Sequence, residues 1–180
     1  IPDNLLFQGK IESYVYSSDT SDKLKFTDIL FGTNAKPKYN PILGNSQYSP
    51  SSTITRWIYN TDYEYSSSLR TTILTNESAN KIKIFARIPM LEAVGTSYSV
   101  FLSIYDIKPY PYVKLKEHQV ISASSDIKMS HLEKMIINVS PATTYTLTMY
   151  MKTNAPSGTY AYSKVGNDAP ATLSIMEIVD

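Results

Sequence analysis

The sequence predicts an all-β fold, an antiparallel jelly roll or β-sandwich of about nine or ten strands. Short runs of alternating apolar and polar residues recur along the chain, and clusters of Gly, Pro and Asn separate them. The chain also holds 15 Tyr and 10 Pro. Tyr favours pleated, half-buried surfaces and Pro marks turns, whereas the Ala, Leu, Glu and Lys periodicity of helical proteins is missing.

The first half of the chain consists of short apolar runs and one long polar segment. We expect residues 1–9 to be a lead-in or the end of a stalk, and residues 10–180 to form a single sandwich head. Residues 33–52 contain four Pro or Gly, so an irregular loop is expected there. Strands rich in Ile, Tyr, Thr and Phe are expected at residues 10–16, 24–31, 53–59, 63–65, 69–75 and 81–88, the last two as a hairpin around residues 76–80.

Residues 98–106 carry large apolar side chains on both faces of an expected strand. Tyr98 and Leu102 fall on one side, whereas Phe101 and Tyr105 fall on the other beside Ser residues. Such a strand is either central in a sandwich or covered by a partner subunit. Further along, Pro holds residues 108–112 extended, strands are expected at residues 113–121 and 133–139, and a short helical turn is allowed between residues 125 and 132.

The stretch from Ser140 to Ile178 organises the predicted fold. Alternating runs at residues 145–151, 159–163 and 172–178 are separated by turns rich in Gly, Pro and Asn. Three antiparallel strands are therefore expected. Nothing in these runs resembles a catalytic motif.

Charge and composition argue against several classes of function. The 17 basic and 16 acidic residues give a net charge of +1, so no nucleic-acid surface is expected. The absence of Cys excludes disulfides and thiolate metal sites. No apolar run is long enough to span a bilayer, so no membrane insertion is expected, and no cofactor either. The chain begins at Ile1 rather than Met, and we expect it to be a piece of a longer protein.

Catalytic and metal-binding patterns are missing, and no enzyme activity is expected. His118 and His131 are the only histidines. On the strand assignment above, neither has a His, Asp or Glu two residues away on the same strand face, so exposed or loop positions and no metal site are expected. Asp62 and Glu64 are two residues apart, as would suit a glycosidase pair or a Ca²⁺ site. A solvated turn between strands is the simpler interpretation of that pair.

Aromatic clusters are the better candidates for a binding site. Trp57, Tyr59, Tyr63 and Tyr65 fall at alternate positions of neighbouring extended segments, next to charged residues. Sugar rings pack their C–H faces on such rings and bond their hydroxyls to planar polar groups, and Tyr also suits protein interfaces. Alternatively, the rings fill the core or a subunit interface. The candidate ligand-binding residues are Trp57, Tyr59, Asp62, Tyr63, Glu64, Tyr110 and Tyr112, the last two on a Pro-Tyr-Pro-Tyr loop.

The C-terminal residues resemble the end of a known family. Residues 140–149 read SPATTYTLTM, a Gly158-Thr159 turn follows, and residues 171–178 read ATLSIMEI. This pattern resembles the close of phage and viral fibre (appendage) head domains, which are compact trimeric jelly rolls of the C1q/TNF-like kind. The resemblance covers the chain from Tyr98 onward.

The resemblance implies a homotrimer on the virion surface, outside the cell, that attaches to a host cell-surface glycan or protein without catalysis. Rings on the second faces of the late strands would then be buried between subunits. Two alternatives stay open: a structural virion fibre or decoration protein without a receptor, and a secreted carbohydrate-binding module or enzyme domain. The candidate trimer-interface residues are Phe101, Tyr105, Tyr150, Tyr160 and Tyr162.

Overall fold

The chain folds almost entirely into β-strands, as the sequence predicts. The computed structural model describes residues 8–11, 26–30, 43–75, 77, 80–95, 97–154 and 160–178. These residues form thirteen strands, more than the nine or ten expected, and one single-turn 3₁₀ helix at Ser67–Leu69. Most of the expected lead-in therefore lies outside the described residues, as do parts of the first two expected strands.

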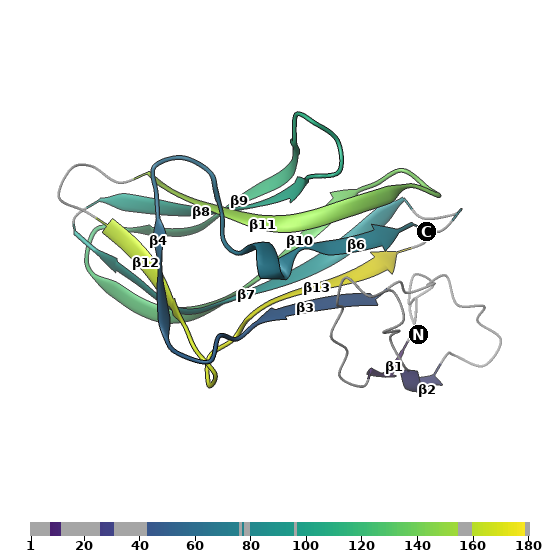
Figure 1. Cartoon of the computed structure of the whole chain (residues 1–180), viewed down its shortest axis with the longest axis horizontal. Helices are drawn as coiled ribbons and strands as arrows, with labels where there is room; N and C mark the ends of the chain where they lie inside the picture. The colour runs from purple at the N-terminus through teal and green to yellow at the C-terminus, as the bar shows by residue number, and fades with distance from the viewer. Residues whose placement is uncertain are drawn as a thin grey trace.

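Two antiparallel sheets form a sandwich of the jelly-roll kind, one above the other in Figure 1. We call them the β7 sheet and the β8 sheet. The β7 sheet contains β3 (Leu43–Tyr48), β4 (Ile54–Ile58), β7 (Lys81–Val94), β10 (Ile127–Asn138), β12 (Tyr160–Val165) and β13 (Ala171–Ile178). The β8 sheet contains β5 (Tyr63–Glu64), β6 (Thr71–Leu74), β8 (Tyr98–Asp106), β9 (Val113–Ala123) and β11 (Thr144–Asn154). Two further strands, β1 (Gln8–Ile11) and β2 (Phe26–Leu30), pair only with each other.

The long strand β7 determines which strands lie side by side in its sheet. It pairs with β10 along one edge, and with β13 and then β12 along the other. The register with β10 shifts beside Pro89 and Met90, and Met90 has a positive φ of 42°. Proline cannot donate a ladder hydrogen bond, so a bulge suits this point. The bulge coincides with the change of neighbour from β13 to β12, and β12 in turn carries β4.

The core lies between the two sheets and comes from the alternation of apolar residues. Tyr98 and Leu102 point inward from β8, whereas Phe101 and Tyr105 lie on its outer face, as expected. In the sandwich this periodicity buries every second residue of the central strands. The largest fully buried side chains are Leu69, Ile82, Ile84, Ile88, Leu91, Leu102, Ile104, Met135, Leu147, Met149, Leu173 and Ile175.

Three local expectations are wrong. The segment 33–52, expected to be irregular, contains strand β3. The expected hairpin does not form, because β6 pairs with β11 whereas β7 lies in the other sheet. The allowed helical turn before residue 133 is absent, because β10 already begins at Ile127. Each error concerns pairing over long sequence distances, which local patterns do not encode.

The three C-terminal strands form as expected, but none of them pairs with another. β11 lies beside β8, β12 lies between β7 and β4, and β13 lies between β7 and β3. The chain therefore changes sheets between β11 and β12. Rings that alternate along these strands consequently end up on two different outer faces.

Two seams between the sheets follow from this topology. On one side the edge strands β9 and β10 meet, and we call this the β9/β10 seam. On the opposite side the edge strand β4 faces β5, and we call this the β4/β5 seam. There the Thr153 amide donates to the Tyr59 carbonyl at 2.8 Å, and the Tyr65 amide donates to the Met149 carbonyl at 2.8 Å.

Candidate functional site

A pocket of about 270 Å³ opens in the β4/β5 seam. It brings together Trp57, Tyr59, Tyr63 and Glu64, four of the residues that the sequence predicts for ligand binding. We call it the aromatic pocket. Its full lining is Thr55, Arg56, Trp57, Ile58, Tyr59, Tyr63, Glu64, Tyr65 and Met151.

The rim of the aromatic pocket consists of half-exposed rings. Trp57, Tyr59 and Tyr63 are 52%, 51% and 52% exposed. The Tyr59 and Tyr63 rings lie 4.7 Å apart, and Trp57 lies 5.3 Å from Tyr162 and 5.7 Å from Tyr160. These rings form a surface on which a flat apolar group can stack.

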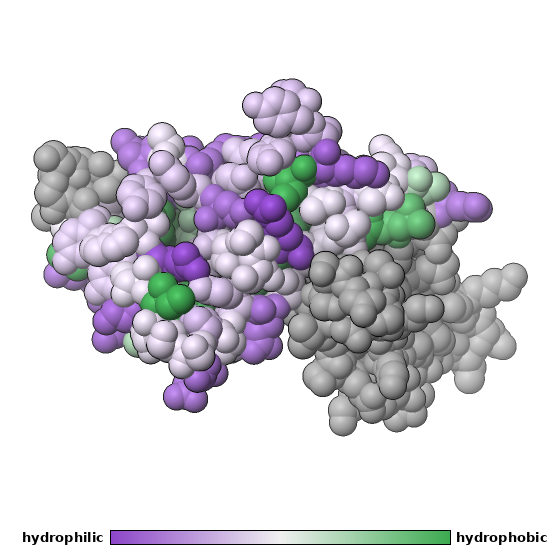
Figure 2. Space-filling view, in the orientation of Figure 1, coloured by the Kyte–Doolittle hydropathy of each residue, from purple (hydrophilic) through white to green (hydrophobic). Residues whose placement is uncertain are grey.

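Strongly hydrophobic residues are scattered over the face of the molecule shown in Figure 2. On the face shown in Figure 2, the described residues are mostly pale or purple, and strongly hydrophobic residues form small separate patches. Rings with polar tips, such as Tyr and Trp, suit ligands that combine apolar faces with hydroxyl groups. The surface therefore favours a mixed ligand over a purely apolar one.

The base of the pocket is buried and fixed by hydrogen bonds. Ile58, Tyr65 and Met151 are each at most 6% exposed. The Tyr65 and Ser163 hydroxyls lie 2.6 Å apart, and the Ser163 hydroxyl donates to the Pro89 carbonyl at 2.6 Å. Burial raises the pKa of Tyr65 to about 12, against the opposing effect of the Ser163 hydrogen bond, so this phenol is neutral.

Arg56 supplies a positive charge to the pocket that no carboxylate of the described residues neutralises. One Nη of Arg56 donates to the Tyr48 hydroxyl, and the guanidinium lies 5.0 Å from the centre of that ring. Its Nε is buried and has no hydrogen-bond partner. No carboxylate among the described residues pairs with this side chain. The sequence analysis placed Arg56 beside the rings but did not identify it as a site residue.

Glu64, the carboxylate in the lining, is already neutralised. Arg70 donates two hydrogen bonds to its oxygens, at 2.8 and 2.7 Å, and the Thr148 hydroxyl adds one at 2.6 Å. Burial raises the pKa of Glu64, but the bonds from Arg70 and Thr148 outweigh burial, so the pKa is lowered overall.

Asp62 has its own partners and does not line the pocket. The Tyr105 hydroxyl donates to it at 2.6 Å and the Lys114 ammonium lies at 2.8 Å. Burial raises the pKa of Asp62, but these hydrogen bonds lower it overall. Neither Asp62 nor Glu64 thus has the raised pKa of a general acid. The pair is not a solvated turn either, because each carboxylate is held by a separate cation.

Tyr110 and Tyr112 form a second, separate aromatic site. Their rings meet edge to face at 5.9 Å on the loop between β8 and β9, which projects from the β8 sheet (Figure 1). Tyr110 is 90% exposed. Neither residue lines the aromatic pocket, so the seven predicted ligand-binding residues do not form one site.

The predicted trimer-interface residues are divided between two outer faces. Tyr105 and Tyr150 lie on the β8 sheet with their rings 4.2 Å apart, and Lys152 lies 5.0 Å from the Phe101 ring centre. Tyr160 and Tyr162 lie on the β7 sheet, stacked 6.0 Å apart next to Trp57. The division follows from β11 and β12 belonging to different sheets.

The histidines are not exposed or in loops, which corrects the sequence analysis. His118 Nδ1 lies 2.9 Å from one oxygen of Glu133, and His131 Nε2 lies 2.7 Å from the other. His131 and Glu133 are two residues apart on the inward face of β10. The sequence analysis began this strand at residue 133, so it did not place the two residues on one strand face. Because the carboxylate lies between the two rings, the trio forms a hydrogen-bonded bridge across the β9/β10 seam. In the described part of the chain no group of three such side chains could hold a metal ion.

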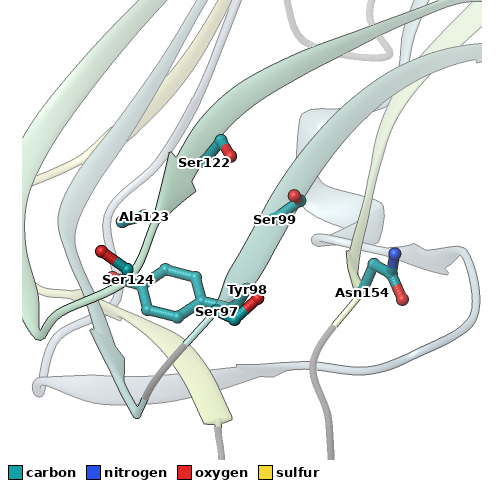
Figure 3. A pocket seen from close by; sticks show the side chains of 7 residues that line it. All are labelled: Ser97, Tyr98, Ser99, Ser122, Ala123, Ser124 and Asn154. Atoms are coloured by element: carbon teal, nitrogen blue, oxygen red, sulfur yellow. The ribbon is translucent and has the colours of Figure 1, made fainter.

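A second, larger cavity of about 620 Å³ lies at one end of the β8 sheet. Figure 3 shows Ser99 and Ser122 on neighbouring strands, with Asn154 at the end of β11. The Tyr98 hydroxyl in this cavity donates to the Ser125 carbonyl at 2.8 Å. The lining contains no charged side chain and a single ring, so it offers less to select a ligand than the aromatic pocket. No motif in the sequence indicated it.

Comparisons with known proteins show only a general likeness of fold. No known family matches the chain, and no curated protein matches it. The infectious bursal disease virus VP2 subviral particle has a TM-score of 0.42 at 10% identity over 96% of this chain and 43% of that one. The Eiger TNF from S. frugiperda has a TM-score of 0.45 at 9% identity, covering 78% of this chain and 94% of that one.

These likenesses are too weak to carry an argument about function. The chain spans less than half the length of the viral capsid chain that it matches, at 43%. Across the described residues, we find no helix with the length and apolar character needed to cross a membrane. The class defined by fold and site is thus an antiparallel β-sandwich domain with an aromatic pocket at the edge between its sheets.

Proposed function

We propose that the chain is the receptor-binding head of a phage or viral fibre, which attaches without catalysis to a glycan on the host surface. The observation that carries this proposal is the aromatic pocket with its half-exposed rim of Trp57, Tyr59 and Tyr63. Exposed rings beside a buried base are typical of recognition sites that stack a flat group and exclude water from it.

The size and chemistry of the pocket favour a sugar ring. At about 270 Å³ it lies just below the range of roughly 300–1,000 Å³ that drug-sized ligands occupy, so one ring-sized group fits it. The rim offers rings for C–H faces, and Arg56 offers a planar polar group for hydroxyls. The lowered pKa values of Asp62 and Glu64 favour binding over glycoside hydrolysis, which needs a protonated carboxyl.

The proposal includes a homotrimer displayed on the virion surface. Its support is the resemblance of the C-terminal residues to trimeric fibre heads, together with rings such as Tyr160, which is 43% exposed. The measurement is the mass in solution. Three times the chain mass of 20.2 kDa is expected, and a monomer at micromolar concentration contradicts the trimer.

Binding of the purified chain to host cells and to a glycan array tests the attachment function. Trp57→Ala is expected to abolish most binding, whereas Leu132→Ala is expected to leave it unchanged, because Leu132 is an exposed apolar residue on β10 outside the pocket. Tyr110→Ala tests the separate loop site. Circular dichroism confirms that the variants fold.

The results also separate the alternatives. Binding to a host protein but to no glycan would mean that the receptor is a protein. A purely structural virion protein predicts no binding by the wild-type chain. A secreted carbohydrate-binding module predicts binding to soluble polysaccharide by a monomer.

A further inference from the structure

We propose that the aromatic pocket selects an acidic sugar, whose carboxylate pairs with Arg56. The inference rests on the proposed attachment function and adds the charge of the ligand. It depends on a contrast between the two charged side chains of the pocket: Glu64 is paired with Arg70, whereas Arg56 has no carboxylate partner among the described residues.

Within the part of the chain that the structure describes, Arg56 is a cation without a counter-ion. It points inward from β4, because Ile54, Arg56 and Ile58 alternate with the outward Thr55 and Trp57. Its partner in the chain is the hydroxyl of Tyr48, which is a neutral acceptor. The guanidinium is charged at any physiological pH, and removing a charge from water without pairing it is unfavourable.

The neighbouring groups cannot supply the missing charge. Glu64 lines the same pocket, but both of its oxygens are bonded to Arg70 and one also accepts from Thr148. The Tyr65 phenol at the base is neutral and is hydrogen-bonded to Ser163. A negative charge for Arg56 therefore has to come from outside the described residues.

The geometry favours a carboxylate on a ring-shaped ligand. A guanidinium presents parallel N–H donors in one plane, which match the two oxygens of a carboxylate. The buried Nε is a donor for which the described residues offer no acceptor. A ligand reaches it only when the Arg56 side chain turns toward the pocket and gives up its contacts with Tyr48. The rings of Tyr59 and Tyr63, 4.7 Å apart, then stack on the sugar that carries the acid, and Trp57 borders the pocket from the outer face of β4.

The test compares matched acidic and neutral sugars. Calorimetry is done with methyl glucuronide, its uncharged methyl ester and methyl glucoside, alongside a glycan array of sialylated and uronic-acid oligosaccharides with their neutral counterparts. The wild-type chain is expected to bind the acidic member on the order of tenfold or more tightly than the neutral one. Its affinity is also expected to fall as salt rises.

Arg56→Gln is expected to lower the affinity for methyl glucuronide to that of its methyl ester, and so to remove this preference. Arg87→Gln is the matched control, because Arg87 is an exposed arginine on β7 outside the pocket. If Arg56→Gln does not fold, the comparison of acid and methyl ester on the wild-type chain still decides the question. Equal affinity for the acid and its ester overturns the inference.

Failure of this inference is distinguishable from failure of the proposed function. If acidic and neutral glycans bind with equal affinity and Trp57→Ala abolishes the binding of both, then the inference is wrong and the attachment function stands. If the wild-type chain binds neither glycans nor host cells, both are wrong.

Discussion

The two seams of the sandwich differ in whether their polar side chains have hydrogen-bond partners. At the β9/β10 seam, both oxygens of Glu133 are bonded to the rings of His118 and His131, which come from the two sheets. At the β4/β5 seam, the Arg56 guanidinium has no carboxylate partner and its Nε no acceptor among the residues that the structure describes. Half-buried polar groups that are satisfied hold sheets together, whereas an unsatisfied one requires an explanation, which for Arg56 we propose to be an external partner.

The difference follows from the lengths of the edge strands. β9 and β10 have 11 and 12 residues, so their side chains can meet across the seam. β4 and β5 have only 5 and 2 residues and leave an opening between them. The aromatic pocket occupies that opening. Four substitutions or titrations test whether the first seam is structural and the second is functional.

Removal of the bridging carboxylate is expected to have the largest effect on stability. Glu133→Ala leaves two imidazoles without their acceptor across the β9/β10 seam, and the free energy of unfolding is expected to fall by about 1–3 kcal/mol. Urea denaturation measures the change. Lys134→Ala, an exposed neighbour on β10, is the control and is expected to stay within about 0.5 kcal/mol. An equal effect of both variants contradicts the bridge.

Acid titration of Glu133 is a second test of the bridge across the β9/β10 seam. Burial raises the pKa of Glu133, but hydrogen bonds from His118 and His131 outweigh burial and lower it below its ordinary value of 4.5. Because the folded-state pKa is the lower one, the stabilisation is present above about pH 4.5 and is lost as pH falls through the folded-state pKa. Denaturation midpoints between pH 3 and 6 (about the range where carboxyls titrate) are expected to fall less steeply toward acid in Glu133→Gln than in the wild type. Identical slopes contradict this assignment.

A satisfied polar group within the β4/β5 seam is expected to contribute a smaller amount. Tyr65→Phe removes the hydroxyl that meets Ser163, while Ser163 keeps its bond to the Pro89 carbonyl. The expected loss of unfolding free energy is about 1 kcal/mol, the usual net value of a neutral hydrogen bond. Thermal or urea unfolding measures it, and sugar binding is expected to persist. No change in stability would indicate that this hydrogen bond does not form.

The smallest effect on stability is expected at Arg56. Arg56→Gln removes a charge that has no counter-ion in the described residues, so the free energy of unfolding without ligand is expected to change by less than about 0.5 kcal/mol. The same denaturation assay measures it. A loss as large as that of Glu133→Ala would mean that Arg56 is a structural residue, and the two seams would not differ.

The sequence predicted the fold class and the strands with strict alternation, such as residues 98–106. It did not predict which strands pair. β3 is concealed in a segment rich in Pro and Gly, and β6 and β7 belong to different sheets although they are neighbours in sequence. Pairing depends on contacts between distant parts of the chain, and a single sequence carries little of that information.

Only part of the site was predicted, again because a single sequence does not show which distant residues come into contact. Trp57, Tyr59 and Tyr63 were identified because aromatic residues at alternate positions are visible within one short segment. Arg56 escaped notice because its distinguishing feature is a missing partner, which only the folded chain reveals. The bridge of His118, His131 and Glu133 was missed because β10 begins earlier than the pattern indicated.

Trp57 permits a direct test of the central claim, because it is the only Trp in the chain and lies at the rim of the aromatic pocket. Its fluorescence is measured with and without an acidic oligosaccharide that the chain retains on an array. The account predicts a shift of emission to shorter wavelength and protection from acrylamide quenching, both saturating at the ligand concentration that saturates binding. Saturated binding with unchanged Trp57 emission and quenching would place the ligand elsewhere and contradict the account.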